Sequence, residues 1–107
     1  MPYRPNQAMQ ASAKRAIEYN ENAAPSQRWG TQVGKVRAQQ IAKGELLSAN
    51  VIQRMFAYLS RTRAIYEAQR DSGNRGKGYY AYLGWGGETA LAWAEDKIRK
   101  MISAGEI

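Results

Sequence analysis

Arginine and lysine are the residues of this sequence whose types and spacing most clearly suggest a binding chemistry. Arg54 and Arg61 are seven residues apart, so on a helix they share a face, and Arg75 and Lys77 follow in a glycine-rich segment. A guanidinium is a planar fork that can bind a phosphate or a carboxylate through two parallel hydrogen bonds. We therefore expect these four cations to form one contact surface for an acidic partner or a phosphate group.

Two features near this surface have more than one interpretation. Segment 71–78, DSGNRGKG, is either a loop whose backbone and cations approach a phosphate or a solvated linker. The arginines of segment 54–70 form either a binding face or a solvated surface partly paired to Glu67 and Asp71. Tyr79 and Tyr80 come directly after the glycine-rich segment, and we expect them to be the exposed aromatic side chains, able to stack on nucleobases.

The acidic residues do not form a catalytic or metal-binding pattern. Glu95 and Asp96 are neighbours, and neighbouring side chains on a helix point about 100° apart, which suits an acid and base pair poorly. Glu18 and Glu21 are three residues apart, but no other type of metal ligand accompanies them. The sequence has no histidine and no cysteine, which excludes histidine-centred triads, thiol nucleophiles and disulfides. We therefore expect a protein that is not an enzyme and that binds no metal, cofactor or small-molecule substrate.

The overall charge also indicates an acidic partner. Sixteen lysines and arginines against nine acidic residues give a net charge of +7 over 107 residues. Such a balance favours nucleic acid or an acidic protein surface as the neighbour. No run of about 18 apolar residues occurs, and the first ten residues lack the apolar stretch of a signal peptide, so we expect neither a membrane-spanning segment nor export by that route.

The elements that must position the cations are predicted to be helices. The sequence indicates an all-α fold, a small single-domain bundle of four to five short helices, because no strand alternation persists. Asn6, Thr31 and Ser48 are the expected N-caps, and Gly44 is expected to end the second helix. The predicted helices span 6–19, 31–43, 48–70, 79–85 and 88–103.

The expected core centres on the third helix, with Leu47 before its N-cap placed to pack on Ile52. In each of the other long helices an apolar stripe at helical spacing is expected to face inwards. The core residues expected from the third helix and from the tryptophans are Ile52, Met55, Phe56, Leu59, Trp85 and Trp93. The other expected stripes are Met9, Ala13, Ala16 and Ile17, then Val33, Val36, Gln40 and Ile41, and finally Leu91, Ala94, Ile98, Met101 and Ile102.

Three segments in this order resemble a small Trp-Gly-Gly-containing helical domain encoded by tailed bacteriophages. They are VGKVRAQQIAKGELLSANVIQRMFAYLSR, the glycine-rich loop after it, and YLGWGGETALAWAEDKI, within a match of about residues 30–102. That domain occurs alone or attached to head-morphogenesis proteins, so the resemblance implies a role in the virion or in its assembly. Relatives end the third helix near a histidine, which this sequence lacks, so no role of that residue carries over. The resemblance rests on Arg54, Met55, Phe56, Trp85, Gly86, Gly87, Glu88 and Trp93.

Two hypotheses about function follow. The first is a non-enzymatic bacteriophage structural protein, such as a decoration or minor head protein, that attaches to the capsid or another virion component and stabilises it. It would be located in the virion, and in the host cytoplasm during assembly. The second is a nucleic-acid-binding module for packaged DNA or host-cell nucleic acid. The salt dependence of binding separates the two, because a phosphate-dominated complex weakens steeply as salt rises.

Overall fold

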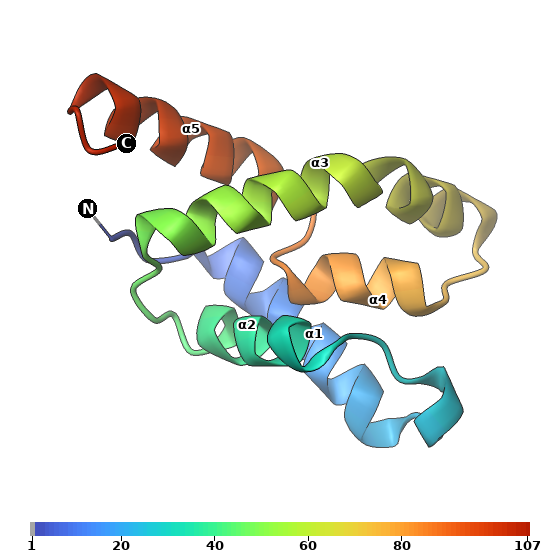
Figure 1. Cartoon of the computed structure of the whole chain (residues 1–107). Helices are drawn as coiled ribbons and strands as arrows, with labels where there is room; N and C mark the ends of the chain where they lie inside the picture. The colour runs from blue at the N-terminus through green and yellow to red at the C-terminus, as the bar shows by residue number, and fades with distance from the viewer. Residues whose placement is uncertain (1) are drawn as a thin grey trace.

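Five α-helices and one short 3-10 helix make up the computed structural model, which describes residues 2–107 (Figure 1). Among these residues the only β pairing is an isolated bridge between Tyr3 and Leu47, so the predicted all-α class is confirmed. In chain order the elements are α1 (Gln7–Asn22), η1 (Pro25–Gln27), α2 (Gln32–Ala42), α3 (Ala49–Ser72), α4 (Lys77–Gly84) and α5 (Ala90–Ser103).

The helices begin where short polar side chains can accept an unpaired backbone amide. Each predicted N-cap accepts a hydrogen bond from the amide three residues later, at 2.8 Å for Asn6, 3.2 Å for Thr31 and 3.3 Å for Ser48. Gly44 follows α2 with a φ of +70°, the left-handed conformation expected of a glycine after a helix. These four local signals were sufficient to fix three helix starts and one helix end.

Several helix boundaries differ from prediction: α1 ends at Asn22 rather than 19, α3 ends at Ser72 rather than 70, and α5 begins at Ala90 rather than 88. Asn20, expected in a loop, lies within α1, and its side chain exchanges two hydrogen bonds with the backbone of Trp29, at 3.0 and 3.1 Å. Helix α4 begins at Lys77 rather than at residue 79, because Gln69 Oε1 accepts the amides of Gly76 and Tyr79 at 2.9 and 3.0 Å.

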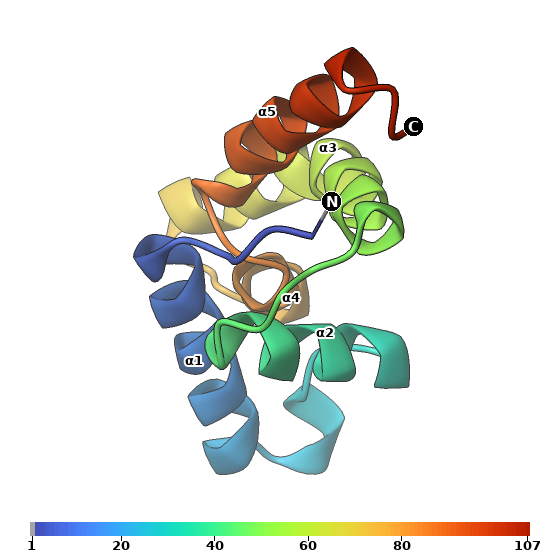
Figure 2. The ribbon, with the colours of Figure 1, turned by 90° about the vertical axis from the view of Figure 1, so that its left-hand side faces the viewer.

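Helix α4 lies at the centre of the molecule. It packs against α1 and α2 on one side and against α3 on the other, and α5 covers the far side of α3. Figure 2 shows α4 end-on between the α1 and α2 pair and α3, with α5 outermost. The long helix α3 therefore has one flank towards α2 and α4 and another towards α5.

The core forms where these layers meet. Ile52, Met55, Leu59 and Trp85 are buried. Trp29, which the sequence placed in a loop, is buried as well, and its Nε1 donates to the carbonyl of Ala16 at 2.9 Å. Trp29, which precedes α2, is therefore as central to the core as the apolar residues of α3.

Two expected core residues lie at its edge. Phe56 is partly buried and lines a shallow cavity with Ile98 between α3 and α5. Trp93 is partly buried, and Lys97 Nζ lies over its ring and over the ring of Tyr3, at 5.8 and 5.2 Å from the two centroids.

Three residues assigned to inward stripes are exposed instead. Val33 and Val36 of α2 and Ile102 of α5 have 52%, 44% and 58% of their surface accessible. Helix α2 is rotated so that its small residues face α1 and α4, because a short side chain allows the close approach of helices. Its inward residues are Gly34, Arg37, Ala38, Ile41 and Ala42.

The turn from α4 to α5 is closely packed. Gly86 and Gly87 have φ values of +119° and +77°, which favour glycine. A Cβ at Gly87 would lie 2.3 Å from Ser12 Oγ, and Ser12 Oγ donates to the carbonyl of Leu83 at 2.9 Å. The Trp-Gly-Gly sequence therefore has a physical role here, since it brings the chain directly past α1.

Candidate binding site

Arg54 and Arg61 are both exposed on the flank of α3 that faces α2 and α4. Tyr58 lies between them in sequence, and the guanidinium carbon of Arg61 lies 5.6 Å from the Tyr58 ring centroid. The Tyr58 ring in turn stacks on Trp85, with the centroids 4.6 Å apart and the planes 20° apart. The two predicted arginines thus stand beside an aromatic pair that joins α3 to the end of α4.

A third arginine joins this pair from α2, and the sequence analysis did not single it out. The guanidinium carbon of Arg37 lies 5.8 Å from the Trp85 ring centroid, and the charge of Arg54 is close enough to act on it. Arg37, Arg54, Tyr58, Arg61 and Trp85 are called the Arg37 cluster below. The cluster bridges two helices that otherwise touch little, and all of its charges are positive.

Arg37 is the least accessible of the three arginines. Only 9% of its surface is exposed, and its Nη1 donates to Gln40 Oε1 at 2.6 Å. Its Nε is buried without a hydrogen-bond partner. Burial lowers the pKa of Arg37, and the nearby charge of Arg54 lowers this pKa further. None of the three arginines is paired with an acidic side chain of residues 2–107.

Arg75 and Lys77 lie elsewhere. The guanidinium carbon of Arg75 is 4.7 Å from the Tyr79 ring centroid, beside the amides that Gln69 caps. Gln69 is eight residues beyond Arg61 on α3, which at 1.5 Å per residue is about 12 Å along the helix axis. Arg54 and Arg61 thus lie beside the Tyr58 and Trp85 rings, whereas Arg75 lies beside Tyr79, about two helical turns further along α3.

The glycine-rich segment is shorter than predicted, and backbone amides in it and next to it already donate hydrogen bonds within the chain. The segment between α3 and α4 spans only residues 73–76, because both flanking helices extend into the predicted loop. Gln69 accepts the amides of Gly76 and Tyr79, and the amide of Asn74 donates to Ser72 Oγ at 3.2 Å. These donors are already used within the chain, which disfavours a phosphate at this loop.

The prediction that Tyr79 is exposed is wrong. Tyr79 is buried and stacks on Tyr66 of α3, with the ring centroids 5.1 Å apart, because the early start of α4 points it inwards. Tyr80 is half-buried and stacks on Tyr19 of α1 at 3.7 Å. Both rings serve packing between helices, and Tyr79 is covered by Tyr66 and by the guanidinium of Arg75.

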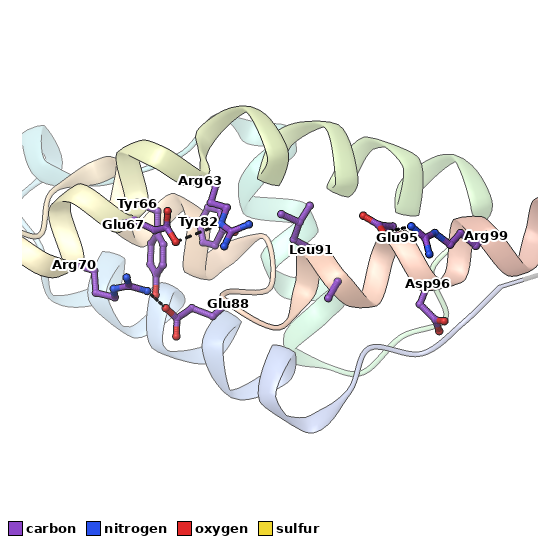
Figure 3. A pocket seen from close by; sticks show the side chains of 11 residues that line it. Arg63, Tyr66, Glu67, Arg70, Tyr82, Glu88, Leu91, Glu95, Asp96 and Arg99 are labelled. Atoms are coloured by element: carbon purple, nitrogen blue, oxygen red, sulfur yellow. Dashed lines mark hydrogen bonds and ion pairs between the residues drawn. The ribbon is translucent and has the colours of Figure 1, made fainter.

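A separate cavity of about 500 Å³ lies between α3 and α5, and its charges are compensated. Figure 3 shows Arg63 paired to Glu67, Arg70 to Glu88, and Arg99 to Glu95 around a floor that includes Tyr66, Tyr82 and Leu91. Arg70 also contacts Asp71, so the predicted pairing to Glu67 and Asp71 involves Arg63 and Arg70 rather than Arg54 or Arg61.

The acids of this cavity are engaged in ion pairs. Hydrogen bonds from Lys97 and Lys100 lower the pKa of Asp96, and Glu95 pairs with Arg99 at 2.7 Å. Among the described residues no three His, Cys, Asp or Glu side chains come together as a metal site. The three arginines of the cavity each pair with a glutamate, and Asp96 pairs with two lysines. The Arg37 cluster, by contrast, contains three arginines and no acid.

Apolar side chains flank the Arg37 cluster on the surface. Val33 lies one helical turn before Arg37 on α2, and Ile65 lies one turn after Arg61 on α3. Both are more than half exposed, at 52% and 54%. The outer surface here is therefore cationic in its centre and apolar at its sides.

Comparison of the sequence with protein-family models finds no matching family, and comparison with curated proteins and with solved structures finds no match either. In the part of the chain that the structure describes, no helix has the length and apolar character needed to cross a membrane.

Proposed function

We propose that this protein is a non-enzymatic structural module of a bacteriophage particle that attaches to an acidic surface of the capsid, or of another virion component, and stabilises it. The observation that carries the proposal is the Arg37 cluster, in which three arginines of two helices have no acidic partner among residues 2–107. The phage setting comes from the resemblance of the Trp-Gly-Gly region. The protein resides in the virion, and in the host cytoplasm during assembly.

The surroundings of the cluster favour a protein partner over nucleic acid. Binding of single-stranded nucleic acid uses exposed aromatic faces, whereas Trp85 and Tyr79 are buried and Tyr80 stacks on another ring. A duplex is bound mainly through phosphates by cations and polar groups. The exposed Val33 and Ile65 instead suit an interface with an apolar part beside its charges.

The absence of enzymatic activity is supported by the state of the acidic side chains. A general base must be available to take a proton, but the acids of the α3 and α5 cavity are held by arginines and lysines. Most of these pairs lie within one helix, and the Arg70–Glu88 pair joins α3 to the turn before α5.

The test is the occupancy of particles of the phage whose genome encodes the chain. The double variant Arg54→Glu with Arg61→Glu should reduce the copy number per particle at least tenfold, measured by mass spectrometry of purified virions. The matched control is Lys14→Glu with Arg15→Glu, which changes the net charge equally on the exposed side of α1. Exposed charges add little to stability, so both variants should keep wild-type helicity and melting temperature.

Two results would contradict the proposal. Unchanged occupancy of the Arg54 and Arg61 variant would remove the cluster from the attachment surface. Binding to naked DNA with a linear, steep loss of log affinity against log salt, sensitive to the same two reversals, would assign the surface to nucleic acid instead.

A further inference from the structure

Arg37 is fixed in position before any partner binds. Its Nη1 donates to Gln40 Oε1 at 2.6 Å, and its guanidinium lies against Trp85, which is itself stacked on Tyr58. The guanidinium of Arg61 lies over the Tyr58 ring. An anion that approaches here therefore meets an ordered guanidinium, and little side-chain entropy is lost on binding.

The same arginine is electrostatically unsatisfied. Its Nε has no hydrogen-bond partner and is buried, and no carboxylate of the described residues pairs with it. A buried guanidinium without a counter-charge is costly, and Arg54 adds repulsion. A bound anion would offset both terms at once.

We propose that Arg37, with Arg54 beside it, is a preformed oxyanion site that receives the side-chain carboxylate of an acidic segment of a partner protein. This inference rests on the proposed function, because it names the group through which the attachment surface recognises its partner. Arg37 provides the inner contact and Arg54 the outer one. Val33 and Ile65 receive apolar side chains of the same segment.

The shape of the surface selects a carboxylate of a protein segment over a phosphate of a nucleic acid. A nucleic acid would need exposed rings for its bases, and Trp85 is only 8% exposed. Valine and isoleucine side chains contact apolar groups, which an acidic amphipathic segment carries and a phosphate backbone does not.

The competing explanation is that Arg37 only covers Trp85. Its aliphatic stem would then stabilise the core, and its charge would be incidental. The two explanations differ for Arg37→Met, which keeps an apolar stem of similar length over Trp85 and removes the charge. If Arg37 acts only through its stem, Arg37→Met keeps both the stability of the chain and its affinity for an acidic peptide. If Arg37 is the oxyanion site, the variant is equally stable or more stable, because an unpaired buried charge is removed, but it loses affinity for the peptide.

The experiment is an NMR titration of the full chain with three probes. They are a capped peptide of glutamates with leucine at every third position, the same peptide with glutamine for glutamate, and inorganic phosphate. The signals followed are the side-chain Nε–Hε of Arg37 and the indole N–H of Trp85, assigned with Arg37→Lys and Trp85→Phe.

The glutamate peptide should shift both signals, and the glutamine peptide should not. Arg37→Met should weaken peptide binding at least tenfold and keep the melting temperature within about 3 °C of wild type or raise it. Arg37→Lys, which keeps the charge but loses the fork, should weaken binding severalfold. The Lys14→Glu control should bind as wild type.

Three results would overturn the inference. One is wild-type peptide affinity in Arg37→Met, which makes Arg37 a packing residue only. The second is the absence of a shift with the glutamate peptide. The third is a tighter response to inorganic phosphate than to the peptide, which assigns the site to nucleic-acid phosphates.

This inference and the proposed function fail separately. If particle occupancy depends on Arg54 and Arg61 but not on Arg37, the proposed function stands and the oxyanion site falls. If the peptide binds through Arg37 but occupancy ignores all three arginines, the oxyanion site stands and the proposed attachment to the particle falls.

Discussion

Replacing Gly84 with alanine separates two opposing effects of the same methyl group. In a helix, alanine in place of glycine usually stabilises by about 0.4–1 kcal/mol, because the unfolded chain loses freedom. At Gly84 the added Cβ would lie 2.4, 2.9 and 3.0 Å from three atoms of the Trp29 ring. Real Cβ atoms do not approach neighbours so closely, so either the ring or α4 must move.

The ring has little freedom to move. Trp29 Nε1 donates a hydrogen bond to the Ala16 carbonyl, and the Trp29 backbone is hydrogen-bonded to the Asn20 side chain. Overpacking of this kind costs about 1–3 kcal/mol, which exceeds the propensity gain. We expect Gly84→Ala to destabilise by about 1–2 kcal/mol net and to lower the melting temperature by about 5–15 °C.

The matched control is Gly34→Ala. Gly34 is also helical and buried, but its added Cβ would lie 3.4 Å from Trp85 Nε1 and 3.6 Å from Thr31 Oγ1, which are ordinary contacts. This variant should be stabilised by a few tenths to about 1 kcal/mol. Thermal and urea unfolding followed by circular dichroism measure both variants. If Gly84→Ala were stabilised as much as Gly34→Ala, the proposed packing of Trp29 on α4 would be refuted.

Three further predictions follow from the packing. Phe56→Ala should lower the free energy of unfolding in urea by about 1.5–3 kcal/mol, because Phe56 is only partly buried. Leu59→Ala, at a fully buried position, should lower it by roughly 3–5 kcal/mol, and equal losses would contradict this reasoning. Ser12→Ala should cost about 1–2 kcal/mol by removing the buried bond to the Leu83 carbonyl, and a cost near zero would exclude that bond. Burial raises the pKa of Tyr66 to about 12, and the charge of Glu88 adds to this rise. Between pH 10 and 12 the Tyr66 hydroxyl therefore ionises in the unfolded chain but not in the folded one. The free energy of unfolding should fall there by up to about 1.4 kcal/mol per pH unit. Urea unfolding across this range should show a shallower slope for Tyr66→Phe, and an unchanged slope would count against the shift.

Local signals were predictable from the sequence, whereas the rotation of helices was not. Asn6, Thr31 and Ser48 act within three residues of themselves, so their capping could be predicted without knowing the neighbours. Tyr79 was assigned to the surface because it follows a polar glycine-rich segment, and its burial depends on Gln69 capping α4 from another helix.

The rotation of α2 explains why Arg37 was missed. Counting only large apolar residues placed Val33 and Val36 inside, although a helix packed closely against neighbours buries small residues. Gly34, Ala38 and Ala42 lie along one such face, and Arg37 is at its border. The signal that could have found it is the repeat of small residues, which requires the sequence to be considered for close helix packing as well as for hydrophobic stripes.

Helix α4 is the shortest of the α-helices, yet its central position should make it the most protected from hydrogen exchange. With eight residues, α4 would not be stable alone, because an isolated helix of this length does not recover its nucleation cost. It is enclosed by α1 and α2 on one side and α3 on the other, so opening it requires those layers to separate. The amides of Tyr82 to Trp85 should therefore exchange with solvent deuterium only when the whole chain unfolds. Helix α5 packs mainly against α3. The amides at its outer end should therefore exchange earlier than those of α4, although α5 is the longer helix.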